Sequence, residues 1–242
     1  MSASLPHSQH EPADEKPPRL DGFVAHGALH EVFAARPADA AAATCFALGL
    51  LKPRRLFWLR QELVQVESGA LYAPGLATLG LDPAQVVIVT LRDALSVLQA
   101  GLEVARTRGL PAGIIELWGA AKPYTLTASR KLVLAAKASG ITLCMINHAV
   151  EPAPSAAETR WQVKRLPSQN LAGQAPGIPA LEATLLRHRS NARAGQVWSV
   201  EWNNEKRCFE TRGQASFAST PPLPEPVVSL PAIRKAPFHK AA

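Results

Sequence analysis

The alternation of short apolar segments with segments of helical periodicity between residues 29 and 166 constrains the fold most strongly. Two segments predict amphipathic helices, Leu91–Thr107 and Leu126–Ala138, the second with Thr125 or Thr127 as N-cap and Gly140 at its end. Apolar strands separated by such helices are typical of a parallel sheet covered on both faces. We therefore expect an α/β core built on a mostly parallel sheet, with strands at Leu29–Phe33, Arg55–Arg60, Val86–Val89, Gly113–Trp118, Ile141–Ile146 and Trp161–Leu166.

The pattern changes after Pro154. Residues 155–160 can form a helical turn that leads into the strand Trp161–Leu166. Three later segments alternate apolar and polar residues and predict antiparallel strands, the last two joined by a hairpin turn at residues 203–206. The sequence thus predicts a C-terminal antiparallel extension of the sheet, formed by Leu181–Arg187, Val197–Trp202 and Arg207–Thr211.

Both ends of the chain differ in composition from its middle. Residues 1–27 are polar and rich in proline, and residues 216–242 hold six prolines without any periodicity. Such composition is typical of segments that do not pack into a core. We expect a disordered N-terminal tail over 1–27, a folded core with a C-terminal β-hairpin over 28–215, and a disordered tail over 216–242.

The composition indicates the cellular compartment of the protein, and the distribution of charge suggests what kind of partner it binds. No apolar run reaches the ~18–20 residues that span a bilayer, the N-terminus has no targeting pattern, and the three cysteines form no C-x-x-C pair. We expect a cytoplasmic protein with no membrane partner. Residues 1–159 carry 14 basic and 14 acidic residues, whereas residues 160–242 carry 12 and 5. This basic C-terminal part suggests contact with nucleic acid or an acidic partner, or only a solubilised tail.

The segment Leu29–Leu51 has the frame of a phosphate-binding P-loop without its chemistry. An apolar strand runs into a seven-residue turn and then into an Ala-rich helix. A P-loop places two glycines, a lysine and a Ser/Thr in this frame to hold phosphates and Mg²⁺. Here these positions hold Ala34, Asp39, Ala40 and Ala41. An aspartate directed into a phosphate nest is repulsive and no cation replaces the lysine, so we expect a dismantled nucleotide site, no cofactor, no metal site and no catalytic residue.

The order of these signals resembles a RecA-type core, and more closely the ImuA family of RecA-like proteins without a working P-loop. The matching pieces, spread over 29–212, are LHEVFA, LYAPGLATLGLD, ELWG, LTASRKLVLAA and SAAETRW. The resemblance implies a RecA-like sheet. It also implies that Glu62 lies near the water-orienting carboxylate of such cores and Glu116 near the Walker B acid. His148 would replace the glutamine that senses nucleotide.

The resemblance also bears on nucleic-acid binding. RecA cores bind DNA through two flexible loops, and the matching segments here, 119–125 and 151–155, are short. This argues against a recombinase-style DNA groove, and residues 1–27 lack the helix that a RecA-like filament needs. The remaining candidate contacts for DNA or a partner are five basic residues and one tryptophan, whose indole could stack on a base: Arg130, Lys131, Arg160, Trp161, Lys164 and Arg165. A tryptophan at the start of a strand is also a common core residue.

The family name implies a role in damage-induced mutagenesis. We therefore expect a non-catalytic adaptor of SOS-induced, error-prone translesion synthesis. Its expected partners are an ImuB-type relative of Y-family polymerases and, through it, an error-prone replicative-type polymerase, with RecA and single-stranded DNA as further candidates. The tail 216–242 is the expected docking segment, since proline-rich segments lose little entropy on binding. Two alternatives stay open: a SulA-like cell-division inhibitor, and an unorthodox ATPase that uses Glu62 and Glu116.

Overall fold

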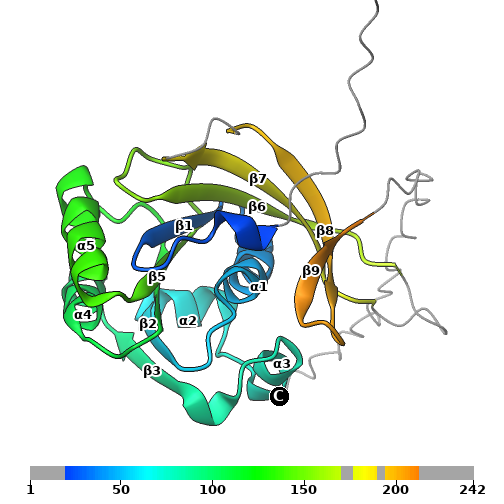
Figure 1. The fold of residues 1–242 in the computed structure, drawn as a ribbon, viewed down its shortest axis with the longest axis horizontal. Helices are drawn as coiled ribbons and strands as arrows, with labels where there is room; N and C mark the ends of the chain where they lie inside the picture. Colours follow the sequence, from blue (N-terminus) through cyan, green and yellow to red (C-terminus); the bar gives the residue numbers. More distant parts are fainter. Residues whose placement is uncertain (1–19, 170–176, 190–193, 213–242) are drawn as a thin grey trace, which may run out of the picture. The chain divides into compact units, whose positions relative to one another are not determined.

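A computed structural model of the 242-residue chain describes residues 20–169, 177–189 and 194–212. Within these residues, nine strands form one sheet in the order β3-β2-β4-β5-β1-β6-β7-β8-β9 (Figure 1). The first six strands pair in parallel and the last three are antiparallel, which confirms the predicted fold class. Their bounds are β1 Leu29–Ala34, β2 Leu56–Gln61, β3 Val86–Leu91, β4 Ala112–Trp118, β5 Thr142–His148, β6 Thr159–Leu166, β7 Ala180–His188, β8 Val197–Asn203 and β9 Cys208–Thr211.

Helices cover both faces of the parallel strands. The described helices are α1 Ala40–Leu51, α2 Glu62–Ser68, α3 Ala73–Thr78, α4 Ala94–Arg106 and α5 Leu126–Ser139, with short 3₁₀ turns η1 Leu20–Phe23, η2 Pro37–Asp39 and η3 Pro83–Gln85. Thr125 caps α5 by accepting a hydrogen bond from the Ala128 N–H at 3.2 Å, and Gly140 ends it with a φ of 84°. This resolves the choice between Thr125 and Thr127. Central strand β5 is buried along its whole length, as its apolar sequence predicts.

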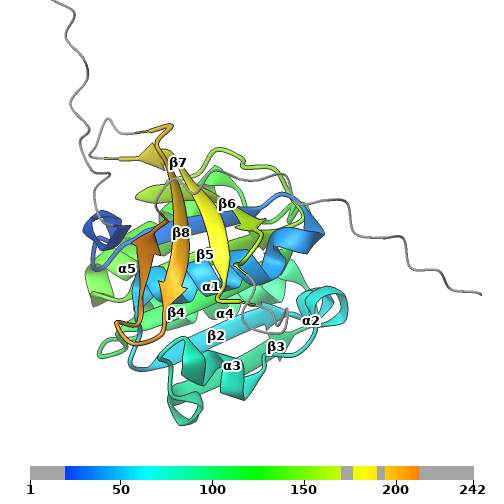
Figure 2. The ribbon, with the colours of Figure 1, turned by 90° about the vertical axis from the view of Figure 1, so that its right-hand side faces the viewer.

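Helix α1 lies on one face of the sheet, and α4 and α5 lie on the other. The side chains of α1 pack with Val32, Ile114 and Ile146 in one core cluster, whereas Leu132 of α5 packs with Ile115 in the second cluster. The antiparallel strands curl around the side of α1 (Figure 2), so that nearly the whole circumference of this helix is apolar and buried. A side chain at Gly49 would collide with the ring of Phe209 on β9, so glycine allows this close approach.

An aromatic cluster joins the N-terminal turn to the antiparallel strands. Phe23 is 4% exposed, and its ring lies 5.6 Å from that of Trp161 and 5.3 Å from that of Trp198. The folded unit therefore begins by residue 20, ahead of the expected boundary at 28, because Phe23 has an apolar site to fill. Residues 1–19 and the expected tail 216–242 lie outside the described residues.

One local prediction is wrong. Residues 151–157 form no helical turn but an irregular connection between β5 and β6. Its backbone is held by side chains instead: the Ala156 N–H donates to Ser129 Oγ at 3.0 Å, and Arg187 donates to the Ser155 carbonyl at 3.0 Å. Side-chain partners from α5 and β7 thus replace the hydrogen bonds that a helical turn would have made.

Candidate functional site: a remnant nucleotide groove

The turn between β1 and α1 is shorter than the sequence suggests. Strand β1 continues to Ala34, which is fully buried, and α1 begins at Ala40. The Ala34 carbonyl accepts a hydrogen bond from the Ala149 N–H at 2.7 Å, so this position is tied to the end of β5. Ala40 and Ala41 lie in the first turn of the helix, where a P-loop would have its lysine and hydroxyl.

Asp39 is not directed into a phosphate nest, so the prediction of a repulsive carboxylate there is wrong. Its side chain is 1% exposed; it accepts from Arg36 Nε at 2.7 Å and from the backbone N–H of Arg165 on β6 at 3.0 Å. Burial by itself would raise the pKa of Asp39, but the hydrogen bonds from Arg36 and Arg165 outweigh it and hold the pKa below its ordinary value. Asp39 therefore fastens the turn to β6, and its charge is already paired with that of Arg36.

Glu116 is the centre of a buried polar network on the α1 face of the sheet. Its Oε2 atom accepts from Arg60 Nε at 2.5 Å and from Trp58 Nε1 at 2.9 Å. Its Oε1 atom accepts from His148 Nε2 at 2.8 Å. All four residues come from the neighbouring strands β2, β4 and β5, and Glu116 is 1% exposed. Both oxygen atoms of the carboxylate are thus bound by protein donors.

The charge state of Glu116 follows from this network. Burial opposes ionisation, but the hydrogen bond and charge of His148, together with the charge of Arg60, hold the pKa of Glu116 below its ordinary value. A general base must be free to take a proton from its substrate. Here both oxygen atoms of the carboxylate are engaged, and Arg60 is in turn bound to the Gly69 carbonyl at 3.3 Å. The arrangement is suited to joining strands and positioning the segment after α2.

A groove of about 480 Å³ lies between α1 and the α2–α3 segment, with Arg60 and Glu116 among its lining residues. Ala40 and Ala41 line it as well, so the structure brings together three of the seven residues expected at a nucleotide site. The others lie elsewhere: Ala34 in the core, Asp39 turned toward β6, Glu62 exposed at the start of α2, and His148 buried behind Glu116. Most of the remaining lining is apolar, from α1, α3 and the segment between α2 and α3.

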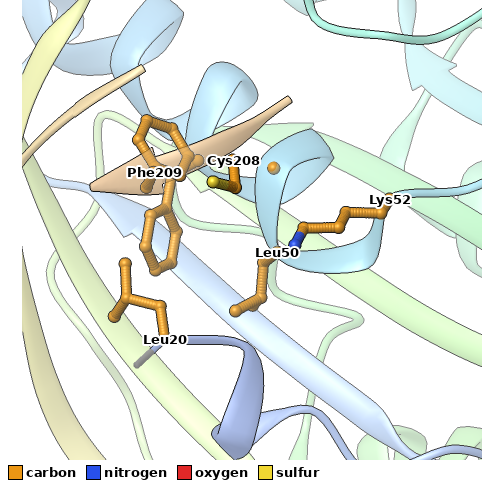
Figure 3. Close-up of a pocket in the computed structure, with 7 residues that line it drawn as sticks. Leu20, Leu50, Lys52, Cys208 and Phe209 are labelled. Carbon is orange, nitrogen blue, oxygen red and sulfur yellow. The ribbon is translucent and has the colours of Figure 1, made fainter. Parts of the chain in front are cut away.

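A second cavity, shown in Figure 3, is too small for a ligand. It lies between η1, the end of α1 and β9, where Leu20, Leu50 and Phe209 approach one another. Its volume is about 20 Å³, which is room for roughly one water molecule. We assign it no function.

The six candidate contacts for DNA or a partner do not form one surface. Trp161 is fully buried against Phe23 and Trp198 and cannot stack on a base, which corrects that part of the prediction. Arg160 pairs with buried Glu31 at 3.2 Å, and Lys164 pairs with Glu182 at 3.4 Å. The other three side chains are exposed, Arg165 on β6 and the remaining two on α5, Arg130 and Lys131.

Glu31 in the middle of β1 is a third buried carboxylate, and it was not among the predicted site residues. Its oxygens accept from Ser155 Oγ at 2.7 Å, from Arg160 and from the Tyr124 hydroxyl, on the α5 face of the sheet. Burial raises the pKa of Glu31 above its ordinary value, and these donors oppose the shift without cancelling it. A glutamate inside the apolar strand LHEVFA was the available signal.

Comparisons with known proteins support the architecture. No protein-family model matches the sequence, and no curated protein is significantly similar to it. Among solved structures, 345 chains resemble this one. One is the crystal structure of the RadB recombinase, with a TM-score of 0.55 and 15% sequence identity, covering 81% of this chain and 97% of that chain. In the part of the chain that the structure describes, no helix has the length and apolarity to cross a membrane. At this identity the likeness concerns the fold alone: the chain has a RecA-like fold.

Proposed function

We propose that this protein is a RecA-like scaffold that does not hydrolyse nucleotide and that serves error-prone translesion synthesis. Its partner would be an ImuB-type relative of Y-family polymerases, and through it an error-prone replicative-type polymerase. The role in translesion synthesis rests on the ordered sequence likeness to the ImuA family over 29–212. The absence of catalysis rests on the chemistry of the groove.

One observation carries the non-catalytic part of the proposal: the β1–α1 turn is held closed by its own side chains. The carboxylate of Asp39 accepts hydrogen bonds from Arg36 and from the Arg165 N–H. Ala40 and Ala41 supply neither a cation nor a hydroxyl. Charge-assisted hydrogen bonds to phosphate are worth ~1.5–3 kcal/mol each. The positions of the P-loop lysine and hydroxyl supply none here, and the one cation of the turn, Arg36, is paired with Asp39. Glu116, the only acidic residue of β4, is bound by three protein donors.

The first experiment measures nucleotide binding by the full-length protein. We expect no saturable binding of a fluorescent ATP analogue and no phosphate release, with or without Mg²⁺. Turnover by the wild-type protein that is lost in Glu116→Gln would favour the ATPase alternative and end the scaffold proposal. A stability measurement on the same variant is needed, because Glu116 also holds three strands together.

The second experiment tests the partner. The full-length protein should co-purify with an ImuB-type protein from the same organism, and a variant lacking residues 216–242 should do so less well. Undiminished capture by the shortened chain would place the contact on the folded core. A titration with fluorescent single-stranded DNA at two salt concentrations tests whether the protein also binds nucleic acid. Binding that weakens with salt and does not depend on ATP would add DNA to the partners.

A further inference from the structure

A groove of about 520 Å³ lies on the α5 face of the sheet. We call it the α5–β7 groove, because α5 forms one side of it and the end of β7 contributes to the other. The connection before β6 adds Pro154, Ser155 and Ala156. Of the acidic and basic residues that the structure describes, only arginines line the groove, namely Arg130, Arg187 and Arg189.

The arginines of this groove have no carboxylate partner in the part of the chain that the structure describes. Arg130 and Arg189 make no side-chain hydrogen bond or ion pair with another described residue, and Arg187 donates only to the Ser155 carbonyl. Apolar side chains lie between them: Leu126 is 42% exposed and Leu134 is 67% exposed. An exposed leucine beside unpaired guanidinium groups fits an occupant that offers both apolar side chains and carboxylates.

The chemistry of the groove favours a protein segment over a nucleic acid. Binding of single strands relies on aromatic side chains on which bases stack. Among the described residues, no aromatic side chain lines this groove, and the indole expected to serve that purpose, Trp161, is buried in the core. Leucine and valine side chains instead offer a surface for the apolar face of a short amphipathic helix.

The chain itself presents such a helix on α2. Glu62, Leu63, Val66 and Glu67 form a stripe that we call the α2 ridge, because positions i, i+1, i+4 and i+5 share one face of a helix. Leu63 is 39% exposed and Val66 is 73% exposed. Neither Glu62 nor Glu67 makes a hydrogen bond or ion pair with another described residue, and α2 has no basic residue.

The α2 ridge cannot reach the groove of its own molecule. The end of α2 lines the remnant nucleotide groove beside α1, whereas α5 lies on the other face of the sheet. Figure 1 shows α2 and α5 on either side of strands β2 and β5. A contact between the ridge and the groove therefore has to join two molecules.

We propose that the α5–β7 groove binds the α2 ridge of a second copy of this chain. Leu63 and Val66 pack against Leu126 and Leu134, and the ridge carboxylates pair with the groove arginines. The two surfaces differ, so the contact is heterologous and leaves one ridge and one groove free for further copies. The inference goes beyond the proposed function and does not depend on it. Two short surfaces predict weak association that depends on protein concentration and weakens with salt.

Sedimentation of the full-length protein tests the proposal over a range of protein and salt concentrations. We expect the average mass of the wild type to rise with concentration. Arg130→Glu or Glu67→Arg should each weaken association by about tenfold or more, because a buried like-charge contact replaces an attractive one. The double variant Arg130→Glu/Glu67→Arg should recover association, because the exchanged charges are again opposite.

Lys131→Glu is the matched control. It makes the same charge change one residue along α5, about 100° around the helix, and Lys131 does not line the groove. It should therefore associate like the wild type. A wild type that stays monomeric overturns the proposal, and so does equal loss in Arg130→Glu and Lys131→Glu. A double variant that stays monomeric, with native circular dichroism, also overturns it.

A nucleic acid is the other occupant that the arginines could attract. Single-stranded DNA titrated into the same variants distinguishes it. Salt-dependent DNA binding that Arg130→Glu abolishes and Lys131→Glu retains, with a monomeric wild type, would assign the groove to nucleic acid and reject the contact between copies.

Discussion

Arginines on the two faces of the sheet are in opposite situations. On the α1 face, Arg60 is 2% exposed and bound to Glu116 and to the Gly69 carbonyl. On the α5 face, Arg130 and Arg189 line a groove without a carboxylate. On the α1 face, the buried charged groups beside the remnant nucleotide groove are bound to one another. We expect a partner on the α5 face, because an unpaired surface cation is free to bind one.

The largest expected effect comes from breaking the Glu116 network. Glu116→Gln removes the charge and leaves Arg60 buried without a counter-ion. Removal of one member of a buried ion pair typically costs ~3–5 kcal/mol of the free energy of unfolding. Urea denaturation should show a loss of that order. The matched control is Glu103→Gln, whose partner Arg106 lies on the exposed surface of α4, and it should unfold like the wild type. Equal midpoints for the two variants would contradict a structural role for Glu116.

The contacts of Asp39 with Arg36 and Arg165 predict a smaller loss of the free energy of unfolding. Asp39→Ala leaves the Arg165 N–H and the Arg36 guanidinium without this acceptor. An unsatisfied buried donor costs ~1–3 kcal/mol, and urea denaturation should show a decrease in that range. If Asp39→Ala instead gains ATP binding without losing stability, the carboxylate acts by repelling phosphate, as the sequence alone suggested, and its role as a brace is rejected.

Two of the three buried carboxylates described above, Asp39 and Glu31, predict opposite pH dependences. The pKa of Asp39 is lowered on folding, so its stabilising contribution is present above the ordinary aspartate pKa near 3.8 and is lost as the pH falls through the folded value. The pKa of Glu31 is raised, so its contribution is present below the ordinary glutamate pKa near 4.5 and is lost as the pH rises through the folded value.

Substitutions separate the two contributions to the pH dependence of the free energy of unfolding, measured by urea denaturation across acidic pH. In Asp39→Asn, the free energy of unfolding should fall less steeply as the pH is lowered. In Glu31→Gln, it should fall less steeply as the pH rises above the ordinary glutamate pKa of 4.5. Both amides keep the size of the side chain, so the slopes report on charge. An unchanged slope in either variant means that other carboxylates dominate that part of the titration.

The smallest effect should come from Arg36→Ala. Arg36 is 63% exposed and is the solvent-facing member of its pair with Asp39, whose other bond to β6 stays intact. Thermal denaturation should shift less than for Asp39→Ala. A shift as large as that of Asp39→Ala would show that the ion pair holds the turn, with the bond to the Arg165 N–H secondary.

The sheet was largely predictable because its signals are local. Apolar runs such as ITLCMI predict buried strands, and Thr125 and Gly140 mark the ends of α5, within a few residues of one another in the chain. The same local signals show that the β1–α1 turn has no lysine or hydroxyl. Residues 155–160 were predicted wrongly because their hydrogen bonds come from Ser129 and Arg187, which are distant in sequence.

Sequence alone thus determined the strands, the helices α1, α4 and α5, and which chemistry the turn lacks, since these depend on neighbouring residue types; the short helices α2 and α3 were not predicted. Only the tertiary structure decided what each charged side chain contacts. Glu116 meets Arg60 from 56 residues away, Asp39 meets Arg165 from 126 residues away, and Trp161 enters the core because Phe23 and Trp198 converge on it. Strand order places these partners together, and that order depends on the packing of whole elements, which no local pattern encodes.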